Sequence, residues 1–181
     1  LSIFNFKEKI WHRGYPLQLL QKPTKIDRLN STLVPDVQAN LWDMAPDIDA
    51  MNRMSLKNEK YKFKISKPYS SNKIMPFNSQ NTIVTNNVIK NYFMFPHIGR
   101  MDDIWAAFYV QSLGFKVIFD KATVYQKRNE HNIYQDFLKE LIGYKNNLNL
   151  IKSLYKSPNN IKKFLPGKSY EAFKVYKKLF I

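Results

Sequence analysis

The stretch GRMDDIWAAFYVQSLGFKVIF, residues 99–119, decides the fold class of this chain. A helix is predicted at its start, because Asp102 or Asp103 can cap the N-terminus and Gly114 suits the position just past the end. The apolar run of residues 115–119 is typical of a buried strand. A helix that leads directly into a buried strand, with further strands before and after, predicts an α/β fold.

The chain on either side of this stretch supplies the remaining elements. Proline residues interrupt the first 46 positions and disfavour long helices there. Alternating polar and apolar residues, or a β-branched run at residues 81–85, predict strands. The expected strands are Val34–Trp42, Tyr61–Ile65, Asn81–Thr85 and Thr123–Tyr125, and the expected short helices are Pro46–Arg53 and Val88–Phe95. From Asn132 the pattern becomes helical, with Ile133, Phe137, Leu138, Leu141, Ile142, Leu148, Ile151 and Leu154 as its apolar residues and a break at Ser157–Asn160. We therefore expect an α/β region over residues 1–145 and a basic helical extension over residues 146–181.

The composition narrows the classes of protein and of partner. The 181 residues carry a net charge of +15, from 29 basic and 14 acidic side chains. Of the basic residues 24 are Lys and 5 are Arg, whereas base reading and bidentate phosphate contacts favour Arg. Nucleic acid is therefore not the expected partner. A basic nucleic-acid-binding module stays open as a less favoured hypothesis, because any basic chain is attracted to phosphates.

The same composition bears on location. The chain has no cysteine, which excludes disulfides and thiolate metal sites, and no apolar run approaches the ~20 residues that span a bilayer. We expect a cytoplasmic protein, and the Lys-rich C-terminal helices leave peripheral contact with an anionic membrane open. The sequence does not begin with Met, so a preceding part is expected to be missing. It gives no prediction of oligomeric state.

Two pairs of carboxylates are candidates for chemistry. Asp47 and Asp49 form an Asp-x-Asp pattern that can bind Mg²⁺ or Mn²⁺ through hard oxygen ligands, or that can simply cap a helix. Asp102 and Asp103 are adjacent, so one can cap the helix while the other faces a cleft. Like charges this close raise one pKa, which suits general acid–base catalysis.

Two further side chains are candidates for ligand binding. His131 lies in the polar loop 126–132, which follows a strand and opens a helix, and we predict it as a metal ligand. Trp42 can stack on a sugar face, although a partly buried core position is an equally simple interpretation.

Four segments in order resemble those of the plant reversibly glycosylated polypeptides, also called UDP-arabinopyranose mutases. They are Arg13–Leu17, Asn40–Trp42 with Pro46–Ala50, Met75–Asn78 with Asn81–Thr82, and Ile98–Ala106. Order and rough spacing agree over residues 11–145. The first segment and the Arg-Asn-x-His loop at Arg128 are also similar to STELLO-type glycosyltransferase-like proteins.

The resemblance implies a glycosyltransferase-A-like mixed sheet with flanking helices, from which the N-terminal, nucleotide-binding half is absent. It also implies a UDP-sugar donor, a glycan or other hydroxyl acceptor, Mn²⁺ or Mg²⁺, and a role in cell-wall or polysaccharide biosynthesis. Asp47 and Asp49 match a segment that does not hold the metal in that family, so they do not inherit the metal role. Asp102 and Asp103 fall where such folds place a catalytic or acceptor-binding carboxylate.

Two departures weaken the mutase interpretation. The stretch Gln18–Gln21 lacks the Arg that becomes glycosylated in the mutases, and Gln126 stands where they have a His.

We therefore predict a nucleotide-sugar-dependent glycosyltransferase with Asp102 and Asp103 as catalytic residues. The alternative is a non-catalytic or truncated relative that binds a sugar or a partner. The predicted substrate-binding residues are Arg13, Trp42, Asn78, Asn81, Arg100 and Arg128.

Overall fold

The computed structural model describes residues 10–20, 27–28 (backbone only), 34–56, 60–63, 65, 67–130 and 132–180. Within these residues, five strands form one mixed sheet in the order β1-β3-β5-β2-β4, with β2 and β5 parallel and the other neighbours antiparallel. The strands are β1 (Asp27–Arg28), β2 (Val37–Met44), β3 (Tyr69–Ser70), β4 (Thr82–Val84) and β5 (Val117–Gln126). The predicted α/β class with flanking helices is confirmed.

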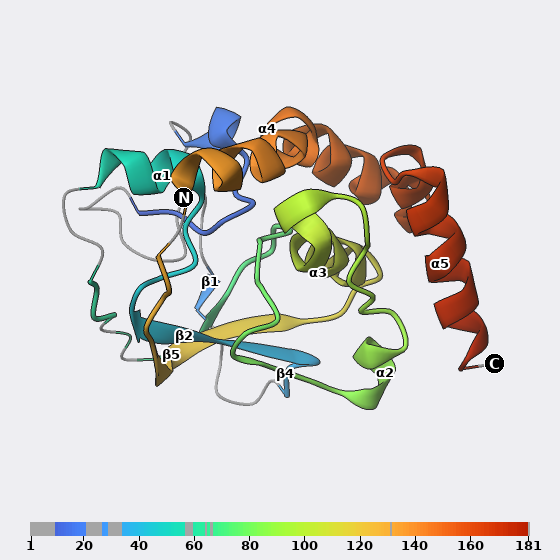
Figure 1. Cartoon of the computed structure of the whole chain (residues 1–181). Coiled ribbons are helices and arrows are strands. Elements are labelled where there is room, and N and C mark those ends of the chain that lie inside the picture. Colours follow the sequence, from blue (N-terminus) through green and yellow to red (C-terminus); the bar gives the residue numbers. More distant parts are fainter. Residues whose placement is uncertain are drawn as a thin grey trace.

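The helices lie mainly on one side of this sheet (Figure 1). They are α1 (Ala50–Ser55), α2 (Asn86–Ile89), α3 (Asp102–Ser112), α4 (Ile133–Lys156) and α5 (Gly167–Lys178). Helix α3 lies between the sheet and α4, and Ile104, Trp105, Phe108 and Val110 on it have no exposed surface. A helix that is apolar all round is suited to this central position.

Residues 117–126 form one strand, whereas two strands were predicted there. The residues that appeared to separate them, Asp120 and Lys121, are partly or fully exposed. Parallel pairing with β2 continues past them, from Val37 opposite Val117 to Met44 opposite Gln126, with one register shift between Asn40 and Trp42. Backbone pairing therefore carries β5 through a polar stretch that hydropathy alone would end.

Other predictions also differ from the structure. The expected helix Pro46–Arg53 is α1, which begins at Ala50, and the expected strand Val34–Trp42 is β2, which begins at Val37. Tyr61 makes an isolated bridge to Met44, and the described residues of 61–65 form no longer strand. Helix α2 begins before the predicted Val88 and ends at Ile89. The capping interpretation of Asp102 and Asp103 is wrong, because α3 follows the 3₁₀ helix Gly99–Met101 and has no side-chain cap.

Helix α4 buries a polar face near its start. Leu138 and Leu141, predicted on its apolar face, are about 40% and 43% exposed, whereas Glu140 and Asn147 are buried. The predicted domain boundary after residue 145 falls inside this helix. Its later residue Leu154 belongs to the same hydrophobic core as α3. The polar face of α4 contacts polar groups of the neighbouring segments, among them Arg100.

Candidate functional site

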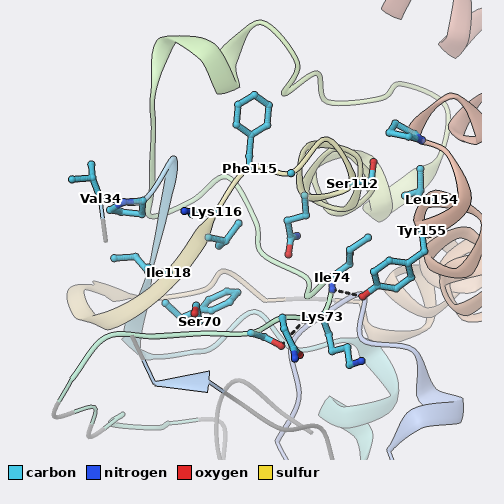
Figure 2. A pocket seen from close by; sticks show the side chains of 18 residues that line it. Val34, Ser70, Lys73, Ile74, Ser112, Phe115, Lys116, Ile118, Leu154 and Tyr155 are labelled. Carbon is cyan, nitrogen blue, oxygen red and sulfur yellow. Dashed lines mark hydrogen bonds between the residues drawn. The ribbon is translucent and has the colours of Figure 1, made fainter. Parts of the chain in front are cut away.

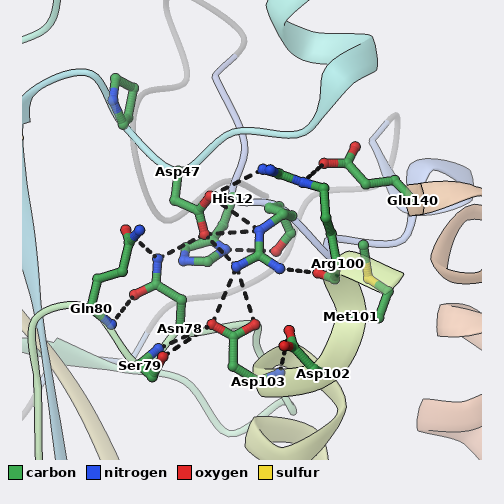
Figure 3. A network of polar contacts seen from close by, with 12 residues as sticks. His12, Asp47, Asn78, Ser79, Gln80, Arg100, Met101, Asp102, Asp103 and Glu140 are labelled. Atoms are coloured by element: carbon green, nitrogen blue, oxygen red, sulfur yellow. Dashed lines mark hydrogen bonds and ion pairs between the residues drawn. The ribbon is translucent and has the colours of Figure 1, made fainter. Parts of the chain in front are cut away.

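Arg13 is the centre of a buried network of ion pairs with Asp47 and Asp103. Figure 3 shows these two carboxylates and their surroundings. Its Nε donates to both carboxylate oxygens of Asp47 at 3.1 and 3.0 Å, and its Nη2 donates to those of Asp103 at 3.1 and 3.2 Å. Its Nη1 donates to the carbonyl of Arg100. Arg13 is 7% exposed, so its guanidinium joins three separate segments of the chain inside the protein.

Two glycines allow these segments to approach one another. Gly14 has a φ of +88°, and a Cβ there would lie 2.3 Å from Cγ2 of Ile104 on α3. Gly99 has a φ of +60°, and a Cβ there would lie 2.2 Å from the carbonyl oxygen of Lys139 on α4. Both positions need a left-handed backbone without a side chain. They bring Arg13 against α3 and Arg100 against α4.

Asp47 accepts more hydrogen bonds than those from Arg13. Asn78 Nδ2 donates to it at 2.7 Å and Arg128 Nη2 at 3.1 Å. Burial alone would raise the pKa of Asp47, but the charges of Arg13, His12 and Arg128 hold it well below its usual range. Asp47 is therefore a permanently charged, fully engaged carboxylate.

Arg100 connects the network to α4. Its Nε donates to Glu140 at 2.8 Å and its Nη1 to Asp136 at 3.1 Å. Glu140 also accepts from the backbone N–H of Ala50 at 2.7 Å and from the hydroxyl of Tyr144 at 2.6 Å. Sequence reasoning missed Glu140. The available signal was its place three residues after Phe137 and seven after Ile133, on a helix face predicted to be apolar.

A hollow of about 230 Å³ opens at the edge of the network. Its lining residues include Arg13, Arg100, Arg128 and Gln80 together with Asp102. The structure thus brings four of the predicted site residues to one concave surface.

Asp102 and Asp103 have opposite environments within this region (Figure 3). The Asp103 carboxylate is buried and accepts from Arg13 and from the backbone N–H of Ser79 at 3.1 Å. The Asp102 carboxylate lines the hollow, is partly exposed, and accepts from the backbone N–H of Asp103 at 2.9 Å. Burial raises the pKa of Asp102, and the neighbouring Asp103 carboxylate adds to the rise.

A second, basic hollow of about 530 Å³ shares Arg128 with the first. Its lining includes Arg53, Lys60, Lys127 and the end of β2 at Met44. Burial lowers the pKa of Arg128, and the charges of Arg53 and Arg100 lower it further, against the effect of Asp47. An anion in this hollow would offset that repulsion between cations.

The remaining predicted substrate-binding residues hold the structure around the site. Trp42 is 3% exposed and donates through Nε1 to the carbonyl of Ala45, so its ring is not open to a sugar face. Asn78 is buried against Asp47, and Asn81 donates to the carbonyl of Leu41 at 2.8 Å. His131, the predicted metal ligand, lies outside the described residues.

The described residues do not fit a divalent cation. Within that part of the chain, no group of three or more His, Cys, Asp or Glu side chains is placed to hold a metal. Asp49 caps α1 by accepting from Asn52 N at 2.8 Å, and it also accepts from Trp11 Nε1 at 2.7 Å. Mg²⁺ and Mn²⁺ need oxygen ligands that are not already engaged, and the oxygens of Asp47 are occupied by guanidinium groups.

A third hollow, of about 460 Å³, lies elsewhere in the fold (Figure 2). Ile74, Phe115, Ile118, Leu154 and Tyr155 contribute to its lining, with Lys73 and Lys116 beside them. It contains none of the predicted site residues, so the candidate site is the pair of hollows that share Arg128.

Comparison with known proteins adds no family assignment: no protein-family model and no curated protein matches the chain. Across the described residues, no helix combines the length and apolar character needed to cross a membrane.

Proposed function

We propose that this chain forms the acceptor side of a nucleotide-sugar-dependent glycosyl-transfer site, in a sheet of the glycosyltransferase-A kind. The observation that carries the proposal is the hollow in which the partly buried carboxylate of Asp102 lies with Arg100 and Arg128. The ordered sequence segments that resemble sugar-nucleotide enzymes support the same reaction class.

Asp102 is the proposed general base. The oxygen of an acceptor hydroxyl bonds to the anomeric carbon of the donor sugar, the bond from that carbon to the diphosphate oxygen breaks, and Asp102 takes the hydroxyl proton. A carboxylate with a raised pKa is a better base for this step than an ordinary surface carboxylate. Gln80, in the lining of the same hollow, can orient a sugar hydroxyl.

Arg128 is the proposed contact for the leaving diphosphate. It lines both hollows, and the lining of the larger one also contains Arg53, Lys60 and Lys127, which outnumber its one acidic residue, Glu130. Cations fixed near a leaving phosphate stabilise the negative charge that develops on it. Arg13 and Asp103 engage each other at 3.1 Å, so we propose that they position the site instead of contacting the substrate.

The divalent cation implied by the resemblance stays a prediction. Because the described carboxylates do not fit a metal, we derive no step through Mn²⁺ or Mg²⁺, and each role above belongs to a side chain of this protein.

A non-catalytic sugar-binding protein is the second candidate. It is favoured by the pairing of Asp47, Asp103, Asp136 and Glu140 with guanidinium groups, which makes much of the site a fixed array of polar groups. Such a protein would bind a glycan and leave nucleotide sugars intact.

Thermal unfolding of the chain with a panel of UDP- and GDP-sugars, with and without Mn²⁺, tests the proposal. A donor that binds only the folded state adds about 2.7 kcal/mol of stability at a hundredfold excess over its Kd. Arg128→Gln should reduce the shift, whereas Lys139→Gln, an exposed change on α4, should not. No shift with any donor would overturn the proposed donor contact, and a shift with glycans alone would favour the second candidate.

A further inference from the structure

Helix α5 is fixed to the fold by one aromatic face. Phe173 packs against Phe95 and Tyr109, with ring centroids 5.2 and 5.3 Å away. Tyr176 packs against Phe93 at 4.9 Å and donates its hydroxyl hydrogen bond to the carbonyl of Ile89. These contacts set the rotation of α5 about its axis, so the same residues always face outward.

The outward face combines lysines with exposed apolar side chains. Val175 is 61% exposed and Leu179, just after the helix, is 74% exposed. Lys168, Lys174 and Lys178 are exposed on the same helix. Exposed apolar residues together with lysines on one helix are typical of a helix that rests on a membrane surface.

The charge of the whole C-terminal region is one-sided. Residues 146–181 contain eight lysines, no arginine, and Glu171 as the single acidic residue. Glu171 pairs with Lys174 at 2.7 Å, and Lys162 and Lys163 are exposed in the 3₁₀ helix Pro158–Lys163 that precedes α5. Most of this positive charge is therefore without acidic partners in its own segment.

We propose that the outer face of α5, with the preceding 3₁₀ helix, docks the protein on an anionic lipid surface. Lys168 and Lys178 provide compact charges on long stems, which suit mobile lipid headgroups, while Val175 and Leu179 enter the boundary between headgroups and acyl chains. A nucleic acid offers fixed phosphates that favour the Arg fork, and it gives exposed Leu and Val no apolar partner. This inference is independent of the sugar-transfer proposal.

Co-sedimentation of the whole chain with lipid vesicles tests the inference. The chain should bind vesicles of phosphatidylcholine with about 30% phosphatidylserine, and it should be released by salt because the attraction is screened within a Debye length. Lys168→Gln with Lys178→Gln should lower the partition coefficient by at least about tenfold, since each lysine near such a surface contributes severalfold. Val175→Ser with Leu179→Ser should also weaken binding without changing the charge.

A matched pair controls for net charge. Lys139→Gln with Lys145→Gln removes two exposed lysines from the first part and the middle of α4, whose start is the end remote from α5 (Figure 1). This pair should leave vesicle binding within about twofold of the unchanged protein, because charges beyond a Debye length of the lipid surface contribute little. Absence of binding to the anionic vesicles, or equal losses in the two lysine pairs, would overturn the inference. An unaffected Val175→Ser/Leu179→Ser variant, or displacement from the vesicles by RNA at equal charge concentration, would overturn it as well.

Discussion

The interior of the ionic network and its rim use the same residue types in different ways. Inside, Arg13 engages Asp47 and Asp103 so fully that the three side chains act as one structural unit. At the rim, Asp102 and Arg128 line a hollow that Arg13 and Asp47 also border, and burial disfavours the charged form of Asp102 and of Arg128. Adjacent residues such as Asp102 and Asp103 can therefore differ completely in role. Pairing makes a charged group structural, and incomplete pairing beside a hollow leaves it available for chemistry.

Removing Arg13 should break the interior most severely. Arg13→Met leaves Asp47 and Asp103 buried without their main partner, which should cost about 3–5 kcal/mol of unfolding free energy. Urea unfolding followed by circular dichroism measures this loss. Lys174→Met is the control, because it breaks an exposed pair with Glu171 and should cost less than about 1 kcal/mol. Similar losses in the two variants would show that burial of the network contributes nothing.

Asp49 should give the stability a pH dependence opposite to that of the paired carboxylates. Burial raises the pKa of Asp49 from 3.8 to about 7, and its donors Trp11 and Asn52 are neutral. Between pH 3.8 and about 7, Asp49 holds a proton in the folded state that it has lost in the unfolded state. Asp49 therefore makes the free energy of unfolding fall as the pH rises, by at most about 1.4 kcal/mol per pH unit.

Asp49→Asn removes that titration and keeps a good capping residue. Unfolding free energies of the two proteins at pH 5, 6 and 7 should therefore diverge, with the variant losing less stability as the pH rises. Parallel pH profiles would contradict the raised pKa of Asp49.

The smallest expected effect is at Met44, on the rim of the basic hollow. Its φ of 81° is unfavourable for a residue with a side chain. Met44→Gly should raise the free energy of unfolding by up to about 1 kcal/mol or leave it unchanged, because glycine adopts this conformation without strain. Met54→Gly, an exposed change within α1, should instead cost about 1 kcal/mol. If Met44→Gly lowered the free energy of unfolding as much as Met54→Gly does, backbone strain at Met44 would be excluded.

Local patterns predicted much of the fold. The β-branched run of residues 81–85 predicted β4, the helix after Arg100 and before Gly114 was expected, and Asn132 was expected to open the last long helix. The hydropathy pattern gave wrong predictions where strand pairing or polar packing determines the structure. It divided the continuous strand β5 in two, and it missed the buried polar face of α4.

The candidate site was predictable in its members but not in its connections. Arg13, Arg100, Arg128 and Asp102 were expected, and the structure gathers them around one hollow. The contacts that assign their roles span 34 residues from Arg13 to Asp47 and 90 from Arg13 to Asp103. No local pattern encodes such distances, so the sequence could not tell which Asp of the adjacent pair is engaged by Arg13.

The central claim is that Asp102 is the general base and that Asp103 positions the site through Arg13. A comparison of Asp102→Asn with Asp103→Asn tests it most directly. Each variant is unfolded in urea and assayed for release of nucleoside diphosphate from the nucleotide sugar that stabilises the chain most. Asp102→Asn should keep its stability within about 0.5 kcal/mol and lose about 10²–10⁴-fold in rate, whereas Asp103→Asn should lose about 1–3 kcal/mol of stability. Full activity in Asp102→Asn, or a larger stability loss there than in Asp103→Asn, would contradict the assignment.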